Sequence, residues 1–230
     1  MEVVDRLKAV LADRYTIERQ VGAGGMADVF LTHDRRHDRK VAIKVMHRDL
    51  SEFVGVERFL REIETTAKLQ HPHILPLFDS GSVDGTVYYV MPFVEGESLR
   101  GRLKREGQLP LADALRITSE IASALGYAHR HGVVHRDLKP DNVMFQDGQA
   151  LLMDFGIALP NRDEESRARL TGSGMTLGTP RYMSPEQVAG QVVDTRSDIH
   201  GLGVLTLRDA RRSAAVHRPD SNGHSRQGGG

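Results

Sequence analysis

The most informative part of this chain is His135-Arg136-Asp137-Leu138-Lys139-Pro140-Asp141-Asn142, followed by Asp154-Phe155-Gly156. It combines one carboxylate that can orient a hydroxyl with an amide and a second carboxylate that can hold metal ions. Phosphoryl transfer needs such a set, because a hydroxyl proton must be accepted and oxygen ligands must hold Mg²⁺ on a triphosphate. We weighed against this a turn of Asp, Pro and Asn that closes a hairpin, and we favour phosphoryl transfer because of the order and spacing.

A glycine-containing segment nearer the N-terminus is a second candidate. Val21-Gly22-Ala23-Gly24-Gly25-Met26-Ala27-Asp28-Val29 lies between two β-type runs and is typical of a hairpin tip. Glycines there let backbone N–H groups approach phosphate oxygens and adopt positive φ. A dinucleotide fingerprint would need a helix after the glycines, whereas Val29-Phe30-Leu31 is strand-like, and a GxxxxGK[ST] loop is absent. Val41-Ala42-Ile43-Lys44 then supplies a lysine on a strand.

Together these motifs resemble the eukaryotic-like serine/threonine protein kinases, especially the bacterial receptor-type members, from about Tyr15 to about Leu205. The resemblance implies an α+β, two-lobed protein-kinase fold with a β-rich first lobe and a mostly helical, C-terminally incomplete second lobe. The expected divisions are an N-terminal amphipathic helix at 1–14, the first lobe and hinge at 15–94, a partial second lobe with catalytic and activation segments at 95–205, and a tail at 206–230.

The resemblance also implies roles for individual residues, with ATP and Mg²⁺ as cofactors and Mn²⁺ as an alternative ion. Asp137 would be the catalytic base or hydroxyl orienter, and Lys139 would neutralise the transferring phosphoryl group. Glu62 would hold Lys44 on the phosphates as its ion-pair partner. Asn142 and Asp154 would bind the metal, since Mg²⁺ prefers oxygen ligands. The expected nucleotide contacts are Val21, Gly22, Ala23, Gly24, Gly25, Met26, Ala27, Asp28, Val29, Ala42, Lys44, Met91, Pro92, Val94 and Met144. Ordinary core packing explains any single apolar member equally well.

A segment resembling the substrate-binding part of such kinases follows the metal motif. In Gly178-Thr179-Pro180-Arg181-Tyr182-Met183-Ser184-Pro185-Glu186, Thr179 would hydrogen-bond to Asp137 and Lys139. Asp198 would anchor the catalytic-loop backbone. Thr171, with Ser173 or Thr176 as a secondary site, is expected to be phosphorylated, because a loop phosphate can be bound by Arg136. The alternative is a flexible Ser/Thr-rich loop without a role.

Composition is that of an ordinary globular protein, with 39% hydrophobic and 27% charged residues and a formal net charge of +0. Neutrality gives no reason to expect a nucleic-acid or anionic-membrane partner. No Cys is present, so disulfides are excluded, and the 11 His residues lack the further ligands that zinc sites need. No signal peptide or apolar run of membrane-spanning length is evident, so we expect a cytoplasmic chain, although a full-length relative could be anchored beyond it.

Hydrophobic periodicity predicts the secondary structure. The expected helices are Met1 to Asp13, Val56 to Leu69, and a long one that Pro110 opens and His131-Gly132 closes. The expected strands are Tyr15 to Val21, Ala27 to Thr32, Lys40 to Met46, Leu75 to Ser82, Thr86 to Met91, Val143 to Gln146 and Ala150 to Met153.

After Leu205 the chain becomes polar, and we expect 206–230 to be disordered apart from a short helical extension through Ala215. Leu202, Val204 and Leu205 would then lose apolar partners, and Glu186 its charge partner. Three interpretations remain open. The chain is a Ser/Thr protein kinase that phosphorylates proteins and its own activation segment, with self-association for reaction in trans. Alternatively, it is a catalytically impaired ATP-binding regulatory module or a nonfunctional truncated or frameshifted kinase remnant.

Overall fold

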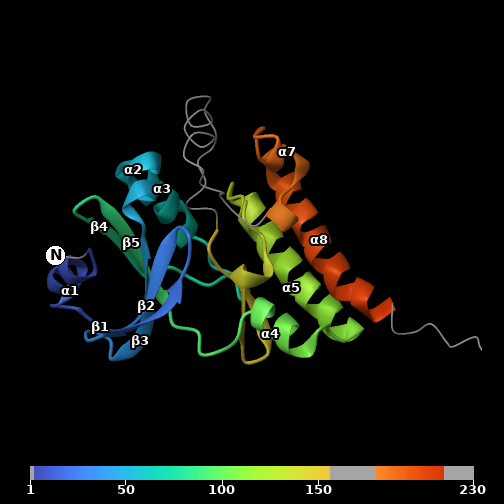
Figure 1. Cartoon of the computed structure of the whole chain (residues 1–230), viewed down its shortest axis with the longest axis horizontal. Coiled ribbons are helices and arrows are strands. Elements are labelled where there is room, and N and C mark those ends of the chain that lie inside the picture. Colours follow the sequence, from blue (N-terminus) through green and yellow to red (C-terminus); the bar gives the residue numbers. More distant parts are fainter. Residues whose placement is uncertain (1–2, 156–179, 215–230) are drawn as a thin grey trace, which may run out of the picture.

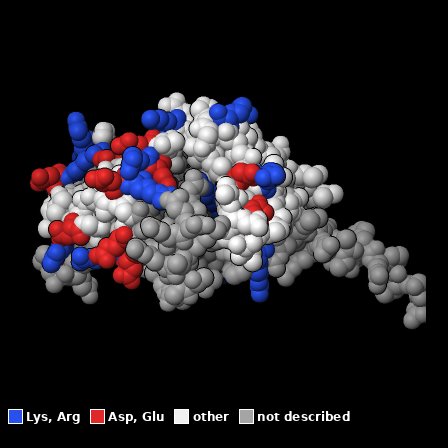
Figure 2. Space-filling view, turned by 90° about the horizontal axis from the view of Figure 1, so that it is seen from above, with Lys and Arg blue, Asp and Glu red and all other residues white. Residues whose placement is uncertain are grey.

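A computed structural model describes residues 3–155 and 180–214 of the chain. A β-sheet lobe built from the first part of the chain lies beside a helical lobe built from the rest (Figure 1). The two-lobed α+β architecture expected from the sequence is therefore confirmed. Lys, Arg, Asp and Glu side chains lie intermixed over the first lobe in Figure 2, in keeping with the neutral net charge.

The first lobe contains a five-stranded antiparallel sheet in the order β1-β2-β3-β5-β4. Its strands are β1 (Tyr15–Ala23), β2 (Ala27–Asp34), β3 (Arg39–Met46), β4 (Asp79–Val83) and β5 (Thr86–Pro92). Strand β4 begins later than the predicted Leu75, because the Leu75 N–H donates to the carbonyl of Leu152 in the second lobe, 2.9 Å away. The segment before β4 thus connects the lobes instead of extending the sheet.

Each face of this sheet is covered by helices, and the alternation of strand side chains decides which residues meet which helix. Helix α1 (Val3–Leu11) buries Leu7 against Val41, Ile43 and Val45 on one face. The opposite face carries the alternate residues of β3, and α3 (Val56–Ala67) packs Phe59 and Ile63 there in one cluster with Ala42 and Met46. Lys44 is on the α3 side by the same alternation, which points it toward the second lobe.

The second lobe is organised around the long helix α5. Its helices are α4 (Leu99–Glu106), α5 (Leu111–Arg130), α7 (Pro185–Val188) and α8 (Thr195–Ala214), with 3-10 turns at Pro140–Asn142 and Pro180–Tyr182. Helices α5 and α8 lie side by side (Figure 1). A hairpin of β6 (Val143–Gln146) and β7 (Gln149–Leu152) packs on α5, and its turn residues Asp147 and Gly148 have positive φ, as the turn signal predicted.

Helix α5 begins and ends where the sequence predicted. Pro110 is its N-cap, and Gly132 takes a φ of +74° just after His131. The sequence pattern did not resolve α2 (Arg48–Val54) or α4 as separate helices. Helix α4 has few apolar positions and starts because the Ser98 hydroxyl caps it, accepting from the Gly101 N–H at 3.1 Å.

The chain around Leu205 is better packed than expected. Helix α8 continues to Ala214, which agrees with the predicted short extension, and residues 215–230 lie outside the described part. Leu205 is only 1% exposed and shares a core cluster with Ile117 and Ile121 of α5. The expectation that Leu205 loses its partners is therefore wrong, because α5 itself buries this residue. Within residues 3–155 and 180–214, no helix is long and apolar enough to cross a membrane.

Candidate active site

The loop carrying Asp137 is fixed through its backbone by a buried carboxylate. Oδ2 of Asp198 accepts from the His135 N–H and Oδ1 from the Arg136 N–H, each at 2.8 Å. A ring nitrogen of His129 lies 2.7 Å from the same carboxylate, which is 1% exposed. Arg136 has a φ of +65°, a left-handed conformation that costs free energy in residues other than Gly. Asp198 thus anchors a strained turn, the role expected for it.

The side chain of Asp137 faces two other residues of the predicted set. Oδ2 of Asp137 lies 2.6 Å from Nζ of Lys139 and accepts from the side-chain amide of Asn142 at 3.1 Å. The same amide donates to the Asp137 carbonyl at 2.8 Å. Because only about a quarter of the Asp137 side chain is exposed, its carboxylate has a fixed direction. The loop therefore presents one carboxylate and one ammonium together.

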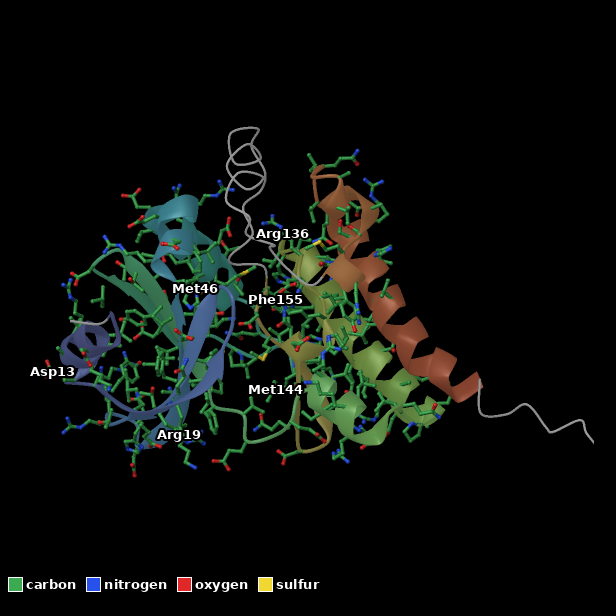
Figure 3. All side chains as sticks on the ribbon, in the orientation of Figure 1. Asp13, Arg19, Met46, Arg136, Met144 and Phe155 are labelled. Carbon is green, nitrogen blue, oxygen red and sulfur yellow. The ribbon has the colours of Figure 1, made fainter. Side chains whose placement is uncertain are left out.

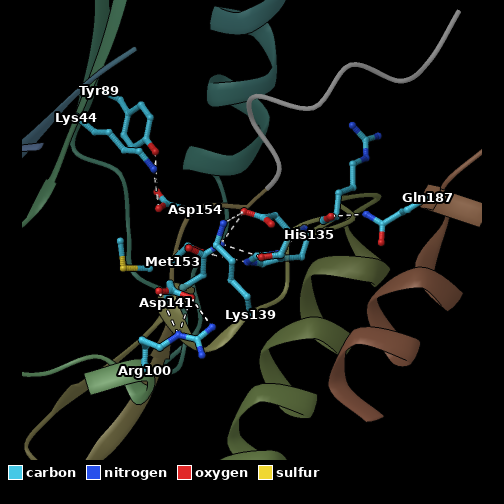
Figure 4. Close-up of polar contacts among 12 residues, drawn as sticks. Lys44, Tyr89, Arg100, His135, Lys139, Asp141, Met153, Asp154 and Gln187 are labelled. Atoms are coloured by element: carbon cyan, nitrogen blue, oxygen red, sulfur yellow. Dashed lines mark hydrogen bonds and ion pairs between the residues drawn. The ribbon is translucent and has the colours of Figure 1, made fainter. Parts of the chain in front are cut away.

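Asp154 lies across from this loop and is held from the first lobe. Nζ of Lys44 is 2.6 Å from its Oδ2, and the Tyr89 hydroxyl donates to its Oδ1 at 2.7 Å (Figure 4). Burial by itself would raise the pKa of Asp154, but the charge and hydrogen bond of Lys44 and the Tyr89 hydroxyl outweigh it and lower the pKa. Burial, with the Asp154 charge, raises the pKa of Tyr89 well above its usual value, so its hydroxyl remains a donor.

The expected ion pair between Lys44 and Glu62 is not formed in this conformation, and that expectation is wrong. Within residues 3–155, Lys44 pairs with Asp154, whereas Glu62 lies 3.6 Å from the guanidinium of Arg58, one turn earlier on α3. The physical reason is that a buried carboxylate strongly needs a counter-charge, and Asp154 takes the only one that Lys44 supplies. Burial raises the pKa of Glu62, although the charges of Arg136 and Arg58 oppose this.

Asn142 and Asp154, the predicted metal ligands, are brought together by the β6–β7 hairpin. The Met153 N–H donates to the Asn142 carbonyl at 3.0 Å, so the residue before Asp154 is hydrogen-bonded directly to Asn142. His135 adds a second link, since one of its ring nitrogens lies 3.0 Å from the Met153 carbonyl. An amide oxygen and a carboxylate on adjacent chain segments fit the oxygen ligands that Mg²⁺ prefers.

The predicted nucleotide contacts gather between the lobes. Met144 and Phe155 lie along the junction (Figure 3), and one core cluster contains most of the apolar candidates. Its buried members among them are Ala27, Ala42, Met91 and Val94, with Met26, Val29 and Met144 packed against them, whereas Val21 and Pro92 are not part of it. The hinge fits closely on β6: the Phe145 N–H donates to the Glu97 carbonyl at 3.1 Å, and a Cβ on Gly96 would lie 2.2 Å from the Phe145 carbonyl oxygen. Only glycine allows this approach.

The glycine hairpin takes the predicted place between β1 and β2. Gly22 pairs with Val29 and Ala23 with Asp28, and Val29 is in turn the cross-strand neighbour of Lys44. The glycines at 22–25 do not adopt the positive φ that was considered for them. A Cβ on Gly25 would meet nothing within 4 Å, so the tip leaves open space instead of forming a strained turn.

The segment at 180–187 contacts the catalytic loop from the other side. Nε2 of Gln187 donates to the Arg136 carbonyl, and the Glu186 carboxylate accepts from the Ser197 hydroxyl. Glu186, expected to lack a charge partner, is thus satisfied by a hydroxyl. Thr179, Thr171, Ser173 and Thr176 lie outside the described residues.

A pocket of about 440 Å³ opens between α3 and the catalytic loop. Its charged lining consists of Arg58, Arg61, Glu62 and Arg136, and Phe155 closes its apolar side. Arginine side chains from both lobes line this pocket, so it can take an anion.

Two contributing residues were not assigned from the sequence. Tyr89 stands opposite Lys44 in the β3–β5 register, so the two share one face and both reach Asp154. The sequence places Tyr89 on a strand, but it does not show that Tyr89 pairs with Lys44 across β3 and β5. Gln187 was not singled out either. It lies three residues after Ser184, the spacing of a capping box, and this spacing is the sequence feature that could have identified it.

Comparison with known proteins agrees with this geometry. The protein kinase domain family matches residues 15–226, and the chain belongs to that family. The match passes Leu205, so the expectation that the resemblance stops there is wrong. The two-lobed fold and the recognition of a Ser/Thr kinase of bacterial type are thereby confirmed.

Several curated bacterial proteins are similar over most of this chain. Serine/threonine-protein kinase pkn2 of Myxococcus xanthus is 42% identical over 204 residues, covering 86% of this chain and 24% of its own length. Serine/threonine-protein kinase PknB of Mycobacterium leprae is 39% identical over 201 residues, which cover 85% of this chain and 32% of PknB. DNA damage-responsive serine/threonine-protein kinase RqkA of Deinococcus radiodurans is 42% identical over 209 residues, which cover 87% of this chain and 30% of RqkA. The chain therefore spans less than two fifths of these relatives.

Proposed function

We propose that this chain transfers the γ-phosphoryl group of ATP to Ser and Thr hydroxyls of proteins. The observation that carries the proposal is the juxtaposition of Asp137 and Lys139 with Asp154 and Lys44, each pair at 2.6 Å. Asp137 and Lys139 belong to the loop that Asp198 anchors. The pair of Asp154 and Lys44 joins the segment after β7 to the first lobe. The similar bacterial proteins are named serine/threonine kinases, which supports the same chemistry here.

In the proposed reaction the substrate hydroxyl oxygen bonds to the γ-phosphorus of ATP, and the bond from that phosphorus to the β–γ bridging oxygen breaks, releasing ADP. Asp137 orients the hydroxyl and accepts its proton. Lys139, held beside Asp137, places positive charge where the transferring group carries its negative charge. Most of the catalytic effect comes from position and charge, because phosphoryl transfer asks little covalent chemistry of the protein.

Asn142 and Asp154 are the residues that would hold Mg²⁺, with Mn²⁺ as an alternative ion. When bound, the ion would neutralise charge on the phosphates. The low pKa of Asp154 keeps its carboxylate ionised for this role. In this structure Lys44 is paired with one oxygen of that carboxylate. Lys44 lies on the strand next to the glycine hairpin, so its ammonium would bind phosphate oxygens of the nucleotide there.

Regulation is proposed at the pocket between α3 and the catalytic loop. A phosphate on Thr171, Ser173 or Thr176 would be bound by Arg58, Arg61 and Arg136, which line this pocket. Such binding would draw Arg58 and Arg136 from Glu62 and release that carboxylate. Phosphorylation of these residues by a second copy of the chain would require transient self-association.

Two measurements test the proposed function. The first is the thermal midpoint with and without Mg²⁺ and a non-hydrolysable ATP analogue, which should rise because a ligand of the folded state stabilises it. The second is transfer of ³²P from ATP to peptides that contain Ser, Thr or Tyr as the sole acceptor. Stabilisation without transfer would favour the impaired ATP-binding module, and absence of both would favour the nonfunctional remnant.

A further inference from the structure

The side chain of Gln187 uses both ends of its amide. Helix α7 begins with a capping box, in which the Ser184 hydroxyl accepts from the Gln187 N–H at 3.4 Å and Oε1 of Gln187 accepts from the Ser184 N–H at 3.0 Å. Nε2 of the same amide donates to the backbone carbonyl of Arg136 at 2.5 Å (Figure 4). The cap needs only the oxygen. The nitrogen is therefore available for the contact with the catalytic loop.

The carbonyl that Gln187 binds belongs to the strained residue directly before Asp137. Arg136 has a φ of +65°, and its N–H already donates to Asp198. Asp198 therefore fixes the N–H side of this residue and Gln187 fixes its carbonyl side. The two peptide units that flank the Arg136 Cα are thus each held by one hydrogen bond, so φ of Arg136 cannot relax without breaking one of them, and the second unit sets the direction of Asp137.

We propose that Gln187 is a positioning residue for phosphoryl transfer, which holds the Arg136 carbonyl and thereby keeps the Asp137 carboxylate in its reactive direction. The inference rests on the proposed function of Asp137. It also connects the segment at 180–187 to catalysis, because movement of α7 would be transmitted through one hydrogen bond to the residue before Asp137.

The decisive variant is Gln187→Glu. A glutamate keeps an oxygen for the Ser184 N–H, and Glu and Gln both serve in a capping box, so helix α7 is preserved. It replaces the donor facing the Arg136 carbonyl by an acceptor, which removes the hydrogen bond to the loop. The matched control is Gln191→Glu, which adds the same charge at an exposed side chain nearby. A second variant, Gln187→Met, removes both the cap and the donor.

We expect Gln187→Glu to lower kcat by about 10-fold to 100-fold, the scale of a misplaced reacting group, with the KM for ATP and the thermal midpoint unchanged. Gln187→Met should lower the thermal midpoint as well, because it also loses the cap. Gln191→Glu should match the parent in all three quantities. A kcat for Gln187→Glu equal to that of Gln191→Glu would overturn the proposal.

Hydrogen exchange of the backbone amides at residues 135–138 gives a reading that does not need activity. The Asp137 N–H donates to the His135 carbonyl at 2.9 Å, and this bond should open more often once the Arg136 carbonyl is released. If the parent transfers no phosphate, the proposed function fails, and exchange alone decides the role of Gln187. Faster exchange in Gln187→Glu than in Gln191→Glu supports the positioning role, and equal exchange refutes it.

Discussion

Nζ of Lys44 lies 2.6 Å from Oδ2 of Asp154, so a charge pair joins the central strand β3 of the first lobe to the loop that follows β7 in the second. Both side chains are less than one fifth exposed. The pair is therefore screened less by solvent than a surface ion pair, and it couples the two lobes electrostatically. Glu62, the expected partner, instead lies near Arg58 and Arg136 beside the pocket under α3.

A double-mutant cycle tests this pairing. We expect Lys44→Met and Asp154→Asn to be coupled by about 1 kcal/mol or more in the free energy of unfolding, because each removes the other's counter-charge. Lys44→Met and Glu62→Gln should be additive within about 0.5 kcal/mol. Denaturant titration of the single and double variants provides the values. Strong coupling of Lys44 to Glu62 in the nucleotide-free chain would contradict the structure.

Replacement of the proposed base separates chemistry from binding. Asp137→Asn keeps the size and an acceptor oxygen for Lys139 but cannot take the hydroxyl proton. Transfer of ³²P should fall to background, while the thermal shift by the ATP analogue stays within error of the parent. Asp147→Asn is the matched control, since this turn residue has a φ of +50° that Asn also tolerates. Turnover within a few-fold of the parent would remove Asp137 from the proposed role.

Phosphorylation of the activation segment is the third expectation. After incubation with Mg²⁺ and ATP, mass spectrometry should find phosphate on Thr171, with Ser173 or Thr176 as secondary sites. The phosphorylated chain should unfold at a higher temperature, and Arg61→Gln should reduce that gain because it removes one pocket cation. Arg48→Gln, on neighbouring α2 and outside the pocket lining, should not. Phosphate found only outside 171–176 would refute the assignment.

The raised pKa of Glu62 predicts a pH-dependent cost to stability. Burial raises this pKa in the folded state, so the unfolded chain releases the proton first as pH increases, and the folded state loses stability between the two pKa values. Glu62→Gln should therefore have a higher thermal midpoint than the parent at pH 7. The difference should vanish below the unfolded pKa of about 4.3. A lower midpoint for Glu62→Gln at pH 7 would show that its ion pairs outweigh burial.

Most of the helices and strands, and the order of the motifs, follow from local sequence, although α2 and α4 were not predicted. Pro110 and Gly132 delimit α5 because a proline suits a helix start and a glycine tolerates the positive φ that follows the end. Asp147-Gly148 closes the β6–β7 hairpin for the same kind of reason. These features depend on φ, ψ and side-chain periodicity over a few residues, and such information is present in a short stretch of chain.

Tertiary structure alone decided which charged and polar groups meet. Glu62 was the expected partner of Lys44, but Lys44 pairs with Asp154, an outcome that depends on how α3 sits against the sheet and how the second lobe approaches it. The contact of Gln187 with Arg136 joins residues far apart in sequence, and the burial of Leu205 depends on the packing of α8 on α5. A side-chain partner is fixed by distances between elements, which no local periodicity encodes, because the free energy of burying a charge depends on everything that surrounds it.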